Sequence, residues 1–129
     1  MAQVTVLTNA GLALATNRIT ALGGNAPKYI TWGTGAGTAT VDRTTLLTEA
    51  TETRTTGTIT QQTTNVLNDT VQVVGRMTCN VTAKTITNAG LLDASAVGVL
   101  FILSSFDGIA MTQNDYIDFT FKAVAKMTT

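Results

Sequence analysis

The stretch Thr70-Val-Gln-Val-Val-Gly-Arg-Met-Thr-Cys-Asn-Val-Thr-Ala83 decides the fold class that this sequence predicts. Small or apolar side chains occupy every second position, at Val71, Val73, Gly75, Met77, Cys79, Val81 and Ala83. The intervening positions are mostly polar: Thr70, Gln72, Val74, Arg76, Thr78, Asn80 and Thr82. Successive side chains of a strand point to opposite faces of its sheet. The alternation therefore predicts a strand with one buried face and one face that is solvated or paired.

The residues that follow predict further strands. Residues 85–87 resume the extended pattern after a break at Ala83-Lys84, and residues 97–103 are apolar on both faces, as in a strand at the centre of two layers. Asp107-Gly108 is a strong hairpin signal, so residues 104–108 are predicted to form a turn. The last strand alternates again, with inward positions at Ile117, Phe119, Phe121, Ala123 and Ala125.

The segment before residue 70 predicts one helix and several shorter strands. Residues 4–8 are expected to form a short strand or an extended arm that starts at Ala2. Thr8 or Asn9 can cap a helix that ends at Gly23-Gly24, with one apolar face at helical spacing. That face consists of Leu12, Ala15, Ile19 and Leu22. Residues 29–32 predict a strand that stops at a glycine-rich loop.

Residues 53–64 have strong β propensity and almost no apolar face. Such a strand fits an exposed sheet edge, or a strand paired with another subunit. Six to eight strands, short turns and one N-terminal helix predict an all-β fold. The expected architecture is a jelly-roll-like β-sandwich formed by residues 1–129 as a single domain, with residues 1–8 as its strand or arm.

The composition indicates a structural role. The chain has no histidine, eight acidic and eight basic residues, and a charged fraction of only 12%. Few side chains are therefore suited to moving protons at neutral pH, and the neutral surface does not favour nucleic acid or anionic lipid. The longest apolar run is far shorter than a membrane span, and the start does not resemble a signal peptide. Cys79 is expected to act as a small buried hydrophobe.

No stretch predicts a catalytic, cofactor or metal site. The loop Gly33-Thr-Gly-Ala-Gly-Thr38 lacks the features of a dinucleotide or phosphate-binding loop and is expected to be a flexible glycine loop. Glu49, Glu52, Asp115 and Asp118 are interpreted as solvated surface acids, and the acids are too scattered for a calcium site. The chain is therefore expected not to be an enzyme and to need no cofactor.

Several motifs, in order along nearly the whole chain, point to a family. They are Asn9-Ala-Gly-Leu12, Tyr29-Ile-Thr-Trp-Gly-Thr-Gly35, Leu46-Leu-Thr-Glu49, Thr87-Asn-Ala-Gly-Leu-Leu-Asp93, Gly98-Val-Leu-Phe101 and the closing strand 115–121. Together they resemble small structural proteins of tailed bacteriophages, namely capsid cement or decoration proteins and related β proteins of tails and fibres. The resemblance implies a β-rich virion component without catalytic residues.

The expected function is that of a cement protein that bridges capsomers and stabilises the DNA-filled shell. The alternative is a tail, neck or fibre subunit that binds a host-surface receptor, with Trp32 and Tyr29 stacking on a sugar. The expected partners are the major capsid protein and further copies of the chain as a dimer or trimer, on the capsid exterior after synthesis in the host cytoplasm. The predicted interface residues are Val4, Val6, Thr8, Thr56, Thr58, Thr60 and Trp32.

Overall fold

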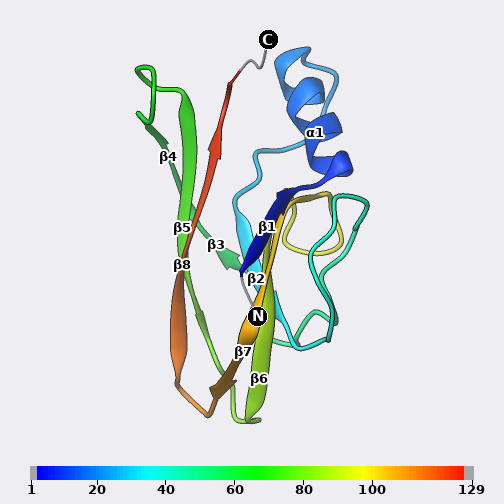
Figure 1. The fold of residues 1–129 in the computed structure, drawn as a ribbon, viewed down its shortest axis with the longest axis vertical. Helices are drawn as coiled ribbons and strands as arrows, with labels where there is room; N and C mark the ends of the chain where they lie inside the picture. The colour runs from blue at the N-terminus through cyan, green and yellow to red at the C-terminus, as the bar shows by residue number, and fades with distance from the viewer. Residues whose placement is uncertain (1–2, 127–129) are drawn as a thin grey trace.

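The computed structural model describes residues 3–126 and contains two antiparallel sheets and one short helix (Figure 1). The elements are β1 (Val4–Leu7), α1 (Asn9–Ile19), β2 (Tyr29–Gly33), β3 (Thr55–Thr56), β4 (Thr58–Gln62), β5 (Thr70–Thr78), β6 (Lys84–Leu92), β7 (Leu100–Met111) and β8 (Tyr116–Val124). The first sheet has the strand order β1-β7-β6-β2-β3, and the second has the order β4-β5-β8. The prediction of an all-β fold with one N-terminal helix is confirmed.

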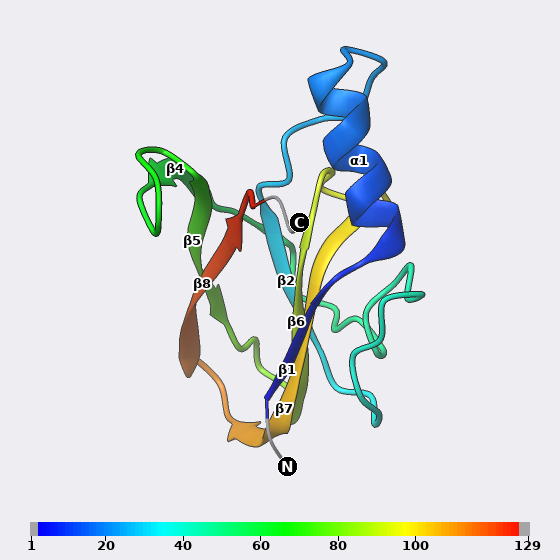
Figure 2. The same cartoon turned by 45° about the horizontal axis from the view of Figure 1, so that its top comes forward.

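The two sheets face each other and share a hydrophobic core (Figure 2). Ile30 and Trp32 of β2 are fully buried against Val73 and Met77 of β5 and Phe121 of β8. Alternation places these side chains on the inner faces, because each strand presents every second residue to the same side. The inward pattern predicted for the last strand is confirmed from residue 117 to residue 123, while Ala125 lies beyond the strand and is exposed.

The outer face of the five-stranded sheet is also covered. The long connection between β2 and β3, residues 34–54, packs Ala39 and Leu46 against Leu92, Leu100 and Leu103. Burial on both sides explains why the start of β7 is apolar on both faces, as predicted. Val97, however, is 85% exposed and precedes the strand, so the predicted beginning of this strand was three residues early.

The predicted turn at residues 104–108 is wrong. β7 continues through Asp107-Gly108 to Met111 because it pairs with β6 on both sides of a register shift at residues 106–108, from Lys84↔Met111 to Leu92↔Leu100. The turn to β8 lies at residues 112–115, where the Asp115 carboxylate accepts hydrogen bonds from Thr112. Long-range pairing therefore overrides the local hairpin signal.

The strand predicted over residues 70–83 ends five residues early, at Thr78. Cys79 is still buried and fits its expected role as a small hydrophobe, but Val81 is 75% exposed. The Asn80 side chain accepts a hydrogen bond from the backbone N–H of Thr82, which stabilises a turn at this point.

The helix begins where the sequence predicts, but its buried face is different. The Thr8 hydroxyl accepts a hydrogen bond from the backbone N–H of Gly11 at 2.9 Å and caps the helix. The helix buries Gly11 and Leu14, whereas the predicted contact residues Leu12, Ile19 and Leu22 are exposed. Gly11 determines this face because a Cβ there would clash with the Phe101 backbone, so only glycine lets the helix approach β7 closely.

The polar segment 53–64 forms two short strands, and both are sheet edges. β3 is the last strand of the first sheet, and β4 is the first strand of the second. The prediction of an exposed edge is confirmed, while the prediction that this edge pairs with another subunit stays a prediction. Residues 4–7 form β1, which pairs with β7 of the same chain. Ala2, where the predicted arm begins, lies outside the described residues.

Candidate functional site: a groove between two sheet edges

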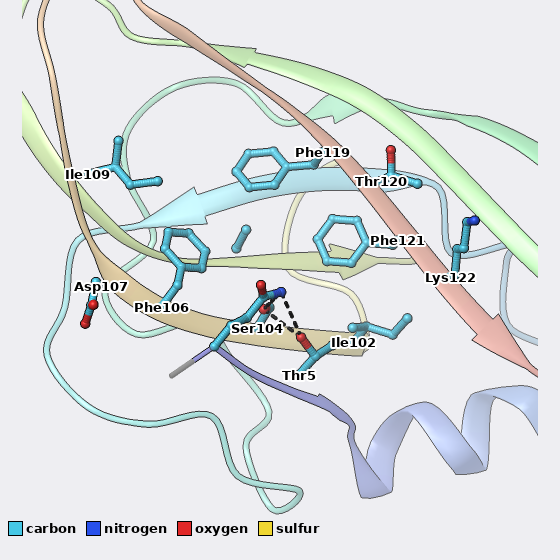
Figure 3. A pocket seen from close by; sticks show the side chains of 12 residues that line it. Thr5, Ile102, Ser104, Phe106, Asp107, Ile109, Phe119, Thr120, Phe121 and Lys122 are labelled. Atoms are coloured by element: carbon cyan, nitrogen blue, oxygen red, sulfur yellow. Dashed lines mark hydrogen bonds between the residues drawn. The ribbon is translucent and has the colours of Figure 1, made fainter. Parts of the chain in front are cut away.

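A groove with a volume of about 470 Å³ lies where the edges of the two sheets face each other (Figure 3). β8 forms one wall, and β1 and β7 form the other. The apolar lining residues are Ala89, Ile102, Phe106, Ile109, Phe119 and Phe121. The polar lining residues are Gln3, Thr5, Ser104, Asp107, Thr120 and Lys122. The volume, and a lining that combines apolar and polar side chains, suit an apolar group with polar contacts at the rim.

Aromatic rings make the β8 wall of the groove. The rings of Phe119 and Phe121 stack with centroids 6.1 Å apart, and Phe119 contacts Trp32 edge-on at 6.4 Å. Both phenylalanines come from alternate positions of one strand, so both point between the sheets. Because Trp32 is fully buried behind Phe119, this wall is anchored in the core.

The polar rim has two different sides. On β1 and β7, the hydroxyls of Thr5 and Ser104 form a hydrogen bond of 2.8 Å, and the Gln3 amide donates to both. On β8, Lys122 makes no hydrogen bond or ion pair within the described part of the chain. The β8 side of the rim therefore carries a cationic group that has no carboxylate partner among residues 3–126.

Two of the strands that line the groove, β1 and β8, are sheet edges. β1 pairs only with β7, and β8 pairs only with β5, among the described residues. An edge strand has backbone N–H and C=O groups available for another strand. On the outer face of the three-stranded sheet, Arg76 of β5 forms a two-pronged ion pair with Asp118 of β8, at 2.7 and 3.1 Å, and lies over the ring of Tyr116. The hydrogen bond from Arg76 holds the pKa of Asp118 below its usual range.

A buried ion pair fixes Trp32 from behind. Glu52 accepts hydrogen bonds from the indole N–H of Trp32 and the backbone N–H of Asn80, both at 3.0 Å, and pairs with Lys84. Burial alone would raise the pKa of Glu52, but these hydrogen bonds outweigh it and lower the pKa to about 2. The interpretation of Glu52 as a solvated surface acid was wrong, because its side chain is only 7% exposed.

The predicted interface residues fall into two groups. Thr56 on β3 and Thr58 and Thr60 on β4 are exposed at sheet edges, so their predicted role stays open. Thr8 and Trp32 are fully buried, the first as the helix cap and the second in the core. For these two the prediction of a surface contact is corrected, because neither side chain is accessible at the surface of this chain.

Val4 and Val6 point toward the connection that covers the five-stranded sheet. Both are half-buried side chains on β1 that pack against the Leu46 cluster on the outer face of the five-stranded sheet. Their contacts are therefore within the chain, although the backbone of β1 remains an edge. The other residue of the sugar-binding alternative, Tyr29, is half-buried and has the Lys28 ammonium 5.8 Å from its ring centroid.

The glycine-rich loop is held in place by close packing. The backbone N–H of Gly35 donates to the Leu47 carbonyl at 2.8 Å, and a Cβ at Gly33 or Gly35 would lie 2.5–2.8 Å from backbone atoms of Leu47. Gly33 and Gly35 are therefore needed for contact with residues 47–48, while the expectation of a flexible loop stays a prediction. Residues 3–126 contain no group of three or more acidic, histidine or cysteine side chains placed to hold a metal ion.

Sequence did not reveal the groove, although the alternating Phe119 and Phe121 were its one visible signal. No protein-family model, curated protein or solved structure matches this chain. Among the described residues, no helix has both the length and the apolar character needed to cross a bilayer.

Proposed function

We propose that this chain is a structural virion protein of a tailed bacteriophage, a cement protein that binds the capsid exterior and stabilises the filled shell. The observation that carries the proposal is that both sheets end in strands available for pairing. Edge strands bind extended segments of a partner through main-chain hydrogen bonds. A protein repeated over a shell needs only moderate affinity per contact, because many copies act together.

The neutral, weakly charged composition supports the same proposal. With eight acids and eight bases among 129 residues, contacts with neighbouring subunits need little desolvation of charge. The proposed partners are the major capsid protein and further copies of this chain, as a dimer or trimer. We place the contact with the capsid at the β3 and β4 edges, where Thr56, Thr58 and Thr60 are exposed.

The proposed architecture is a jelly-roll-like sandwich. β6 pairs with β7 in one sheet, while the flanking strands β5 and β8 pair in the other. One antiparallel pair thus lies between the two strands of another pair in the sequence, and the two pairs belong to different sheets, as is typical of Greek-key and jelly-roll folds.

The copy number of the chain in purified particles, measured by quantitative mass spectrometry, tests the proposal. A simple ratio to the major shell protein supports a capsid position. A few to a few dozen copies per particle would instead favour the tail, neck or fibre alternative, and absence from particles would overturn the virion proposal. Particles that lack the protein should also burst at a lower temperature, and an unchanged burst temperature would contradict cementing.

A surface variant tests the position of the capsid contact. Thr60→Lys places a charge on the exposed β4 edge and should lower the occupancy of the protein on particles, because lysine discourages pairing at strand edges. Thr78→Lys is the matched control, since Thr78 is exposed on β5, the central strand of the same sheet. Equal occupancy for the two variants would exclude the β4 edge as the contact.

A further inference from the structure

The free edge of β8 has a sequence that complements itself. β8 runs from Tyr116 to Val124, and its midpoint is Thr120. If a second copy of β8 lies antiparallel to the first with Thr120 facing Thr120, all nine residues of the strand find a partner. In this register Asp118 of each copy faces Lys122 of the other, at two symmetry-related places.

The side-chain faces also agree in this register. Directly opposed residues of an antiparallel pair project to the same face of the sheet. Asp118 and Lys122 both lie on the exposed outer face, while Phe119 faces Phe121 of the second copy on the inner face. Shifting the second strand by two residues in either direction keeps the faces but places Asp118 opposite Thr120 or Val124. The charge match therefore selects the register centred on Thr120.

The neighbouring strand extends the charge match. Arg76 of β5 already pairs with Asp118, and Gln72 lies beside Lys122 in the β5–β8 register. Across the joined sheets, the outer face would carry a row of Gln72, Lys122, then Asp118 and Arg76 of the second copy. Each Lys122, which has no carboxylate partner among the described residues of its own chain, gains one. Each Asp118 then lies between two cations.

We propose that this chain forms a twofold-symmetric dimer through antiparallel pairing of β8 with β8 of a second copy, centred on Thr120. The pairing joins two three-stranded sheets into one six-stranded sheet and removes two free edges. It also places the second copy at the mouth of the groove, where it covers the aromatic wall formed by Phe119 and Phe121. The proposal does not depend on the virion function, because it concerns the purified chain.

Charge-reversal variants test the proposal directly. Lys122→Glu places a glutamate opposite Asp118 twice per dimer, and Asp118→Lys places a lysine opposite Lys122 twice. Each variant alone should be monomeric, with a dissociation constant raised at least about tenfold, because like charges directly opposed across strands are unfavourable. An equimolar mixture of the two should form heterodimers, since both cross-strand pairs then have opposite charges.

Analytical ultracentrifugation and native mass spectrometry of the wild type, each variant and the mixture give the readout. Arg43→Glu is the control for the change of charge, because Arg43 lies in the loop on the far side of the five-stranded sheet. It should leave the dimer unchanged. Urea unfolding of each variant verifies that it folds, which matters most for Asp118→Lys because that change also removes the partner of Arg76.

A cysteine at the symmetry axis tests the register independently. In the proposed dimer, Thr120→Cys brings two thiols to opposed positions and should give a disulfide-linked dimer under mild oxidation. Gln72→Cys is the control, because Gln72 lies on the next strand and is far from its copy. The native Cys79 is buried and should not compete.

Three results would overturn the proposal. They are a monomeric wild type at high concentration, a dimer that Lys122→Glu does not weaken, and equal cross-linking of the two cysteine variants. A dimer with the expected charge pattern but absent from phage particles would support this inference and refute the proposed virion function, so the two failures are distinguishable.

Discussion

Two hydrogen bonds between the Asn88 side chain and the backbone of Leu47 form a clamp that holds the 34–54 connection on the five-stranded sheet. The replacement Asn88→Asp changes one atom of this clamp. Asn88 is fully buried on β6, and its side chain bonds to both backbone groups of Leu47. Its Oδ1 accepts from the Leu47 N–H at 3.1 Å, and its Nδ2 donates to the Leu47 carbonyl at 2.9 Å. Aspartate has the same shape but replaces the donor with an oxygen.

The protonation state of the new aspartate decides how much unfolding free energy the variant loses. A protonated carboxyl can donate to the Leu47 carbonyl as the amide does, so the variant should be close to the wild type at low pH. An ionised carboxylate would face that carbonyl in a buried site and would be destabilised, while the Leu47 N–H offsets part of the penalty. The pKa of the introduced group should therefore rise on folding, by roughly 2–3 units for a fully buried carboxyl with one donor.

The magnitude and its sign follow from this shift. A group whose pKa is raised in the folded state stabilises most below its unfolded pKa of about 3.9 and loses that contribution as pH rises. The difference in unfolding free energy between variant and wild type should grow from nearly zero at about pH 4 to about 3–4 kcal/mol at neutral pH. Above the folded pKa the difference should become constant.

Urea unfolding monitored by the fluorescence of the single, buried Trp32 measures this difference. Comparing variant with wild type at each pH cancels the titration of other groups. Asn17→Asp on the exposed surface of α1 is the control and should change stability by about 0.5 kcal/mol or less. If the loss of unfolding free energy in Asn88→Asp is independent of pH, or no larger than in Asn17→Asp, the proposed role of the clamp is refuted.

Three further predictions concern other contacts of the fold. Gly11→Ala should destabilise by about 1–3 kcal/mol in urea unfolding, despite the better helix propensity of alanine, because the new methyl group meets the β7 backbone. Glu52→Gln should cost about 2–4 kcal/mol at neutral pH because Lys84 loses its buried partner. The pKa of Glu52 is about 2 in the folded wild type and 4.5 in the unfolded chain, so the ionised carboxylate stabilises the fold above pH 4.5 and this stabilisation is lost toward pH 2. The unfolding free energy of Glu52→Gln should therefore fall less on acidification than that of the wild type. Arg54→Lys should lower the melting temperature because lysine cannot replace the two-pronged pairing with Glu49, and an unchanged value would contradict this role.

Strand alternation predicted the elements whose two faces differ in environment. In β8, Phe119 and Phe121 face the core while Asp118 and Lys122 face water, so the period of two is visible in the sequence. The same holds for β5 as far as Thr78. The clamp at Asn88 lies beyond such reasoning, because its partner Leu47 is 41 residues away and the pattern of either segment does not specify the other.

Two of the wrong predictions, the turn at residues 104–108 and the buried face of α1, have the same physical cause. Asp107-Gly108 has the composition of a turn, but β7 pairs with β6 on both sides of a register shift at residues 106–108, so the chain continues as one strand there. The buried face of α1 depends on the absence of a side chain at Gly11, which a count of apolar residues cannot register. In both places tertiary packing outweighs a local preference of about 1 kcal/mol. The groove was missed for a similar reason, since it exists only where two sheet edges meet.

Buried asparagine and serine side chains explain why the outer face of the five-stranded sheet is covered while the edge of β8 has no pairing strand among the described residues. The 34–54 connection contains no strand, so its backbone groups need other partners. Asn88 supplies them to Leu47, and Ser105 accepts a hydrogen bond from the backbone N–H of Ala39 at 2.9 Å. These bonds fix the connection over the rear face of the five-stranded sheet. Within the described residues, no strand pairs with the free edge of β8 beside the groove, so the proposed assembly through β8 leaves the rear face unchanged.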